Sequence, residues 1–345
     1  MTASLRDNLR RLYQIEEGEG RTFSLLALNF FLIIGGNYVI GRSVGRSLFL
    51  SNLPPQYIPL RYIIVTAGVV FTSLAYARYN ASFRLDRLII GSTAVMALGI
   101  LLFRLLLATP LAGSLLLLGG LFVFLEILAV LSTVQFWTLA SDLLNSRKAK
   151  RLFGPISAMG GLGGILAGAF VSLFAAPVGT ANLLFVLIAC QVGCMLCVWI
   201  LGRQNETILQ QASGSPARGK PQNHSLSRGF WEMRTVPLLL SMAAIGVVTT
   251  MVSNIVDYQF DLTLQSSFLG DEEGLTAFLG SFYFWAGISG FLIQLFLSAR
   301  LLSLLGFSLT LAILPLSFAI GSVTVLLTGA ALWAVTPVSY THLRA

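Results

Sequence analysis

Long apolar segments constrain this chain more than any other feature. A helix that crosses a membrane needs about 20 mostly apolar residues, because the hydrocarbon core is ~30 Å thick and the helix rises ~1.5 Å per residue. Nine segments meet this requirement: Thr22–Gly41, Pro59–Tyr79, Leu88–Leu107, Leu111–Ala140, Leu152–Phe174, Ala181–Gly202, Val236–Tyr258, Thr276–Ala299 and Leu301–Leu326. We therefore predict an all-α integral membrane protein with about nine complete transmembrane helices, plus the start of a tenth near Gly329.

The composition agrees with lipid as the solvent. Hydrophobic residues make up 56% of the chain and charged residues only 10%. Soluble domains carry about 25% charged residues, so water cannot be the solvent for this much apolar surface. The first predicted partner is thus the lipid bilayer.

Basic residues fix the predicted orientation, because cytoplasmic loops are enriched in Lys and Arg. With the N-terminus in the cytoplasm, one strict alternation of segments puts 17 of the 22 basic residues on the inner side. They fall in five groups, at Arg6–Arg21, Arg78–Arg87, Arg147–Arg151, Arg203–Arg234 and Arg300. Topology accounts for the net charge of +8, so we expect no nucleic-acid partner.

The predicted segments divide the chain into five parts. Residues 1–21 form a cytoplasmic leader, 22–202 a six-helix half, 203–235 a polar linker, and 236–337 a partial second half. Residues 338–345 are abruptly polar, and we expect them to be an artefactual tail on a truncated chain. Six spans, a long cytoplasmic linker and further spans is the layout of the major facilitator superfamily, so we predict a helical bundle of that type.

Glu126 is the first candidate for a functional residue within the membrane. It lies about 15 residues into the fourth segment, with Trp137 eleven positions later on the same helical face. Charged groups inside a membrane are costly, so they are candidates for function. Two interpretations remain open: Glu126 faces a substrate cavity, or it is protonated and hydrogen-bonds a neighbouring helix.

A second polar face closes the seventh segment. Asn254, Asp257 and Asp261 recur at spacings of three and four residues. Intramembrane acids usually face inward, so Asp257 is expected to line a cavity. The alternative places it at the outer membrane interface, where a charge is cheap.

Arginines mark the outer end of the first segment, where Arg42 and Arg46 follow Tyr38 at intervals of four. Guanidinium groups bind phosphate and carboxylate through two parallel hydrogen bonds, so this stripe could receive an anion. The alternative is that both side chains extend from the helix end into the outer interface.

Other features argue against an enzyme or a cofactor. The three cysteines, Cys190, Cys194 and Cys197, all lie in one apolar segment and are expected to be packing residues. The glycines of Gly160–Gly164 and Gly168 are expected to let helices approach closely rather than to bind a nucleotide. No nucleophile–base pair or metal-ligand set can be assembled, so we expect neither catalysis nor a cofactor.

Several stretches of the chain resemble one family, the ATP/ADP translocases of plastids and intracellular bacteria. The stretches are Asn37-Tyr-Val-Ile-Gly-Arg42, Glu126 through Gln135-Phe-Trp-Thr-Leu-Ala-Ser-Asp142, Asn145-Ser-Arg-Lys-Ala-Lys-Arg-Leu-Phe-Gly154 with the glycines after it, and Asn254-Ile-Val-Asp-Tyr-Gln-Phe260. The likeness spans most of residues 22–335 and marks the ATP/ADP translocase-like branch of the major facilitator superfamily.

The resemblance implies membrane-embedded acidic and basic residues that act in nucleotide exchange. Glu126 and Asp257 match two acidic positions of the family. Two basic positions depart from it, because Gly45 and Asp261 stand where lysines are expected. Fewer positive charges weaken the case for ATP, a highly charged anion that needs compensation in a low dielectric.

We therefore predict a secondary transporter in a bacterial cytoplasmic membrane that exchanges nucleotides or a related organic anion by alternating access. Its site residues would be Glu126, Asp257, Asn254, Arg42, Arg46, Asn37 and Trp137. Two alternatives remain open: a non-transporting membrane anchor or regulatory module of the same fold, and a transporter of a non-nucleotide substrate.

Overall fold

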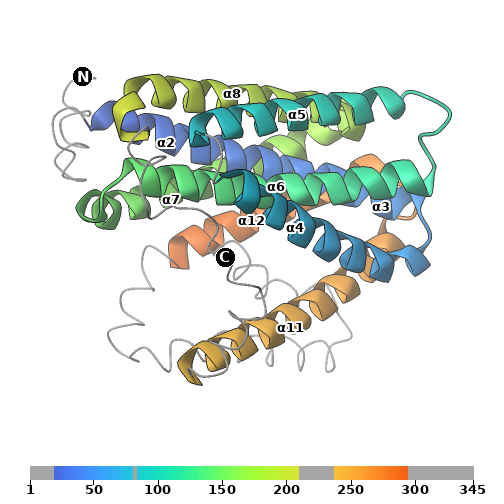
Figure 1. The fold of residues 1–345 in the computed structure, drawn as a ribbon. Coiled ribbons are helices and arrows are strands. Elements are labelled where there is room, and N and C mark those ends of the chain that lie inside the picture. Colours follow the sequence, from blue (N-terminus) through green and yellow to red (C-terminus); the bar gives the residue numbers. More distant parts are fainter. Residues whose placement is uncertain (1–18, 81–83, 210–236, 294–345) are drawn as a thin grey trace.

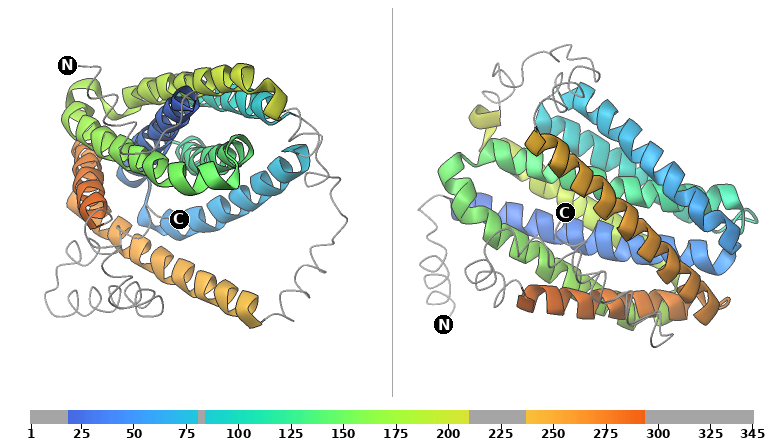
Figure 2. Two further views of the ribbon diagram at one scale, coloured as in Figure 1. Left: turned by 90° about the vertical axis from the view of Figure 1, so that its left-hand side faces the viewer. Right: turned by 90° about the horizontal axis from the view of Figure 1, so that it is seen from below.

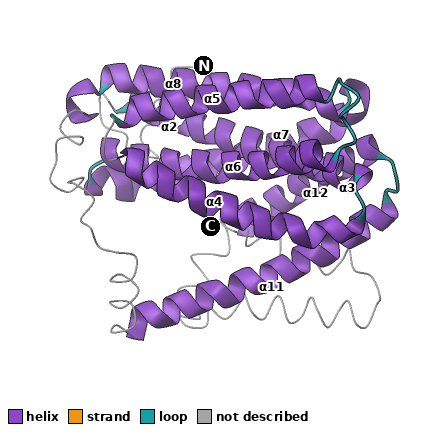
Figure 3. Ribbon diagram, turned by 45° about the vertical axis from the view of Figure 1, so that its right-hand side comes forward, coloured by secondary structure: helices purple, strands orange, loops and turns teal. Residues whose placement is uncertain are grey.

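The computed structural model describes residues 19–80, 84–209 and 237–293, and every regular element within these ranges is helical (Figures 1 and 3). The predicted tail, the ninth segment, the start of the tenth, and most of both the 203–235 linker and the leader lie outside these ranges. Seven of the described helical stretches are long and apolar enough to span a membrane. The chain is thus an all-α integral membrane protein, as its apolar segments predicted.

The long helices lie roughly side by side, with α11 diverging from the others along part of its length (Figures 1 and 2). In chain order they are α2 (Gly20–Leu32), η1 (Ile33–Gly41), α3 (Arg42–Asn52), α4 (Ile58–Asn80), α5 (Leu85–Leu106), α6 (Leu115–Leu143), α7 (Ser146–Val178), α8 (Leu183–Gln204), α11 (Pro237–Ser267) and α12 (Glu272–Leu292). Two short 3-10 turns, η2 (Pro55–Tyr57) and η3 (Thr180–Asn182), begin α4 and α8.

The first transmembrane helix is longer than predicted. The helical stretches α2, η1 and α3 join without a break into one helix of 33 residues, Gly20–Asn52, whose middle part η1 is π-helical. The prediction ended this helix at Gly41 because Arg42 and Arg46 interrupt the apolar run. The chain continues as a helix since α3 buries its other face, including Val44, Leu48 and Phe49.

The seventh predicted segment is also longer than expected, because α11 runs to Ser267 and not to Tyr258. Asp257 and Asp261 therefore lie inside the helix, about 15 and 9 Å from its end at a rise of ~1.5 Å per residue. In both cases the prediction ended the helix where charged residues interrupt the apolar segment. In the folded chain, charged residues on other helices neutralise these charges, so the helix continues.

Loops predicted to share one side of the membrane meet at one end of the bundle. The start of α7 and the end of α8 lie together at this end (Figure 1). Ion pairs join the elements there: Lys148 binds Glu19 at 2.9 Å, Arg151 also pairs with Glu19, and Arg84 reaches Glu206 at 2.9 Å. We call this the basic end.

We call the other end of the bundle the opposite end. Side-chain amides hold it together by donating hydrogen bonds to backbone carbonyls and to one carboxylate. The Gln265 side chain on α11 donates to the backbone carbonyls of Leu50 and Leu53, at 2.9 and 2.7 Å. Asn52 donates to the Glu272 carboxylate at 3.2 Å. These bonds connect α3 to the two helices that follow residues 210–236.

Glycines bring α7 and α12 into backbone contact, as expected for the glycine-rich run. A Cβ atom built at Gly168 would lie 2.6 Å from the backbone nitrogen of Phe284, and one at Gly280 would lie 2.4 Å from the nitrogen of Ser172. Contacts this short exclude a side chain at either position. Small residues therefore set the distance between these helices.

Replacing Gly168 by Val is expected to lower the melting temperature of the detergent-purified protein, because the added atoms must push α12 away from α7. Overpacking of this kind costs about 1–3 kcal/mol. Gly161→Ala is the matched control on the same helix, because a Cβ there meets nothing within 4 Å. Equal melting temperatures for the two variants would contradict the backbone contact.

Candidate functional site

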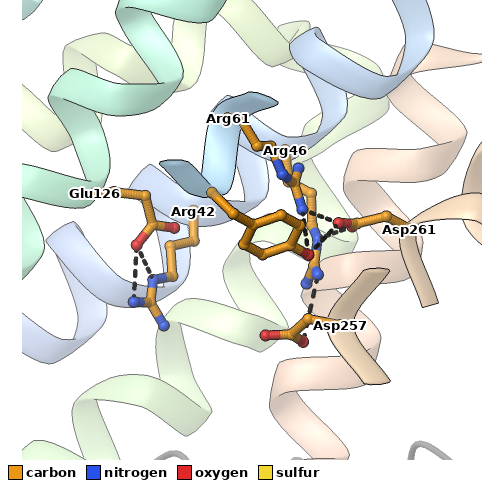
Figure 4. A network of polar contacts seen from close by, with 7 residues as sticks. Arg42, Arg46, Arg61, Glu126, Asp257 and Asp261 are labelled. Carbon is orange, nitrogen blue, oxygen red and sulfur yellow. Dashed lines mark hydrogen bonds and ion pairs between the residues drawn. The ribbon is translucent and has the colours of Figure 1, made fainter. Parts of the chain in front are cut away.

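Six charged side chains from four helices meet inside the bundle (Figure 4). Arg42 and Arg46 lie one turn apart on α3, Arg61 on the first turn of α4, and Glu126 on α6. Asp257 and Asp261 lie one turn apart on α11. At ~1.5 Å per residue, all six lie roughly 5–17 Å from the helix ends at the opposite end, so they occupy the half of the bundle nearer to that end.

Arg42 and Glu126 form one ion pair. The Arg42 Nη2 and Nε atoms both donate to the Glu126 Oε2 atom, at 2.8 and 3.1 Å. Both side chains are partly buried. The Arg42 guanidinium also lies over the Tyr38 ring, 4.5 Å from its centroid. Such a cation–π contact stabilises the charge where water is scarce.

Asp261 is the centre of a second, more deeply buried cluster. Its side chain is fully buried, and three groups donate to its carboxylate. The Arg46 Nε atom donates to Oδ1 at 2.5 Å, the Tyr62 hydroxyl donates to Oδ2 at 3.0 Å, and Arg61 Nη2 forms an ion pair with Oδ2. Asp257 joins the cluster more loosely, with its Oδ1 atom 3.5 Å from Arg46 Nη2.

Aromatic rings surround the arginines of this cluster. Arg61 lies 4.6 Å from the Phe122 centroid and 4.9 Å from that of Tyr62, and Arg46 lies 5.1 Å from that of Phe260. The rings exclude water, so the charges interact in a lower dielectric than at a surface. A charge left without its partner here would be expensive.

The two ion-pair groups border one cavity of about 250 Å³. Its lining includes all three arginines together with Glu126, Asp257, Asn254 and the rings of Tyr38, Tyr62 and Tyr283. With Asp261 behind Arg46 and Arg61, three guanidinium groups balance three carboxylates.

A wider, mostly apolar cleft adjoins this cavity. Ile63, Val70 and Phe71 of α4 line it, and it shares Tyr62, Thr66 and Asn254 with the charged cavity. A charged compartment beside an apolar one suits a molecule with an anionic group and an uncharged body.

Five of the seven residues predicted from sequence come together at this cavity: Arg42, Arg46, Glu126, Asn254 and Asp257. Asn37 and Trp137 are not among its lining residues. Asn37 is fully buried in η1 and donates to the Ser132 hydroxyl at 2.9 Å. Trp137 packs edge-on against the rings of Phe30, Phe136 and Phe153. Eleven residues separate Trp137 from Glu126, which is about 16 Å along the helix, so a shared face does not bring them to the same level.

Sequence reasoning missed Arg61 and Tyr62 as members of the site. The sequence feature that could have identified them is an arginine followed by a tyrosine at the start of an apolar segment.

Gly45, which stands where the resemblance predicts a lysine, has a packing role in the structure. A Cβ at Gly45 would lie 3.1 Å from Leu125 Cδ1, so this position packs against α6 while Arg46 reaches the cavity.

Comparison with known proteins gives one family. The model of the family described as "TLC ATP/ADP transporter" matches residues 121–336, which is more than half of the chain. No curated protein and no solved structure matches the chain significantly.

Asp261→Asn is expected to destabilise the protein more than Asp257→Asn in buffer without multivalent anions. Removing one partner of a buried ion pair costs about 3–5 kcal/mol, and Asp261 is fully buried between two guanidinium groups. Asp257 is 39% exposed and more distant from Arg46, so its loss should cost less than about 1 kcal/mol. Melting temperatures in detergent measure the difference, and equal losses would show that Asp261 is not the central anion of the cluster.

Proposed function

The chain belongs to the TLC ATP/ADP transporter family, and from this membership and its charged cavity we propose that it is a secondary transporter that exchanges nucleotides or a related organic anion by alternating access. The substrate would bind in the cavity between α3, α4, α6 and α11. Family membership supports transport of a nucleotide. The cavity supports an anion held within the membrane.

One observation carries this proposal: three arginines and three acids meet around a cavity inside a bundle of apolar helices. Charged groups are rare within a membrane because they are costly, and where they occur they usually line a substrate or ion path. A purely structural bundle would gain nothing from six of them at one level.

The geometry suggests a role for each group. Arg42 and Arg46 would attract the anionic part of the substrate, since a guanidinium offers parallel donors to phosphate or carboxylate. Glu126 would orient or release Arg42, to which it binds at 2.8 Å. Asp257 would do the same for Arg46, and Asn254 would bind the uncharged part of the substrate.

The proposed transport cycle requires two groups of helices to move against each other. The six-helix half would comprise α2 to α8, and α11 and α12 would begin a second half, as in the major facilitator superfamily. Hydrogen bonds from Gln265 to Leu50 and Leu53 support a closed opposite end in this state. With the basic end on the cytoplasmic side of a bacterial inner membrane, the cavity would alternate between cytoplasm and exterior.

The charge balance of the cavity favours a second candidate, an organic anion with fewer charges than ATP. Each arginine already has a carboxylate partner, so the cavity offers no net positive charge. A trianion or tetra-anion would be poorly compensated there. A monoanion or dianion requires only that one or two of these pairs rearrange.

Proteoliposomes that contain the purified full chain are expected to exchange external labelled ATP or ADP for internal nucleotide. Glu126→Gln should slow exchange by roughly tenfold or more, a loss of about 1.4 kcal/mol, because Arg42 loses its charged partner. Glu206→Gln is the matched control: it also removes a carboxylate paired with an arginine, but at the basic end.

No uptake above empty vesicles, for nucleotides and for smaller organic anions alike, would reject transport and favour a membrane anchor or regulatory module. Uptake of a smaller anion without nucleotide exchange would support the second candidate. Equal rates for Glu126→Gln and the control would remove Glu126 from the site.

A further inference from the structure

Asp261 occupies the position that a substrate oxyanion would take. Its two oxygens receive hydrogen bonds from Arg46 and Tyr62 and an ion pair from Arg61. A phosphate or carboxylate group of a ligand binds guanidinium groups in the same way. Figure 4 shows the Asp261 carboxylate held between the two guanidinium groups.

Arg61 has hydrogen-bonding capacity that Asp261 does not use. Its side chain is 4% exposed and lines the cavity, yet its Nε and Nη1 atoms have no hydrogen-bond partner among the described residues. Buried donors without acceptors are unfavourable. These two nitrogen atoms, which carry three N–H groups, therefore provide a site for a further acceptor that enters the cavity.

We propose that Asp261 is an internal counter-anion: it neutralises an oxyanion subsite formed by Arg46 and Arg61 while the cavity is empty, and a phosphate or carboxylate of the substrate replaces it. The inference rests on the proposed transport function and adds Arg61 as a substrate-binding residue. It also gives a role to the acid that stands where the family resemblance predicts a lysine.

The exchange of anions explains how substrate could control the opposite end of the bundle. Asp261 lies on α11, whereas Arg46 and Arg61 lie on α3 and α4. Separating α11 from these helices without a substitute would leave two guanidinium groups unpaired within the membrane, which is costly. With a substrate oxyanion on the arginines, the same movement leaves both guanidinium groups neutralised, and Asp261 alone must then be solvated or protonated as α11 moves away. The empty protein is thus held closed at this end, and exchange is favoured over leakage.

The size of the cavity agrees with a subsite for one group. Pockets for whole drug-sized molecules measure about 300–1,000 Å³, whereas this one measures about 250 Å³. In the closed state it suits a phosphate or diphosphate moiety, and the remainder of a larger substrate would need the adjoining cleft.

The test is anion binding by the purified full chain in detergent, read as thermal stabilisation by inorganic pyrophosphate. Asp261→Asn removes the competing charge, so half-maximal stabilisation should need about tenfold less pyrophosphate than in the unaltered protein. Tyr62→Phe, which removes one donor to Asp261, should shift the concentration in the same direction by a smaller factor. Tyr62→Phe also allows the proposal to be tested if Asp261→Asn does not fold.

Two further variants complete the test. The double variant Arg61→Gln/Asp261→Asn keeps the charge balanced and should lose the gained affinity. Asp86→Asn is the control, because Asp86 is likewise a buried acid paired with an arginine, Arg84, but at the basic end. It should bind pyrophosphate like the unaltered protein.

Three results would overturn the proposal. The first is unchanged or weaker pyrophosphate binding by both Asp261→Asn and Tyr62→Phe. The others are a double variant that binds pyrophosphate as tightly as Asp261→Asn, and no stabilisation of any variant by pyrophosphate. None of these depends on nucleotide exchange. If the protein transports its substrate but the variants bind pyrophosphate with unchanged affinity, only the counter-anion role of Asp261 is rejected. If the variants shift pyrophosphate binding as expected but the protein does not transport, the proposed function is rejected and the role of Asp261 stands.

Discussion

The neutralisation of charge inside an apolar bundle is the constraint on which the rest of this structure depends. Asp261 is fully buried and held by Arg46 and Arg61, and each of these residues comes from a different helix. Within a membrane none of the three charges is tolerable alone. Their pairing therefore fixes α3, α4 and α11 at one level and creates the cavity at the place where these helices meet.

The other contacts of the bundle surround this charged centre with structure of a different kind. Glycines set the close approach of α7 and α12, and ion pairs such as Lys148–Glu19 gather the loops at the basic end. These features serve packing and topology. The charged centre also joins helices, but apolar side chains would do so at lower cost. Its presence is most simply explained by a substrate that carries charge, in agreement with the family of the chain.

Much of the fold could be predicted from sequence because membrane helices obey a strong rule about apolar length. Seven of the nine predicted spans correspond to described helices that are long and apolar enough to cross a membrane, and hydropathy with basic residues also predicts the grouping of loops at two ends. The predicted helix ends were less accurate. Charged residues such as Arg42 and Asp261 interrupt the apolar sequence, but the helices continue past them. At the site, residues with a costly charge deep in a segment, such as Glu126, stood out. Arg61 did not, because it lies near the start of its segment and its partner is 200 residues away in the chain. Asn37 and Trp137 shared a motif or a helical face with site residues, but the buried Asn37 side chain bonds Ser132 and Trp137 lies ~16 Å along α6 from Glu126.

A structure of the protein with a bound phosphate-containing ligand, ATP or pyrophosphate, tests the central claim most directly. We expect the phosphate to lie within hydrogen-bonding distance of the Arg61 and Arg46 guanidinium groups, with the Asp261 carboxylate withdrawn from both. A ligand bound elsewhere in the molecule, with Asp261 still held between the two arginines, would contradict it.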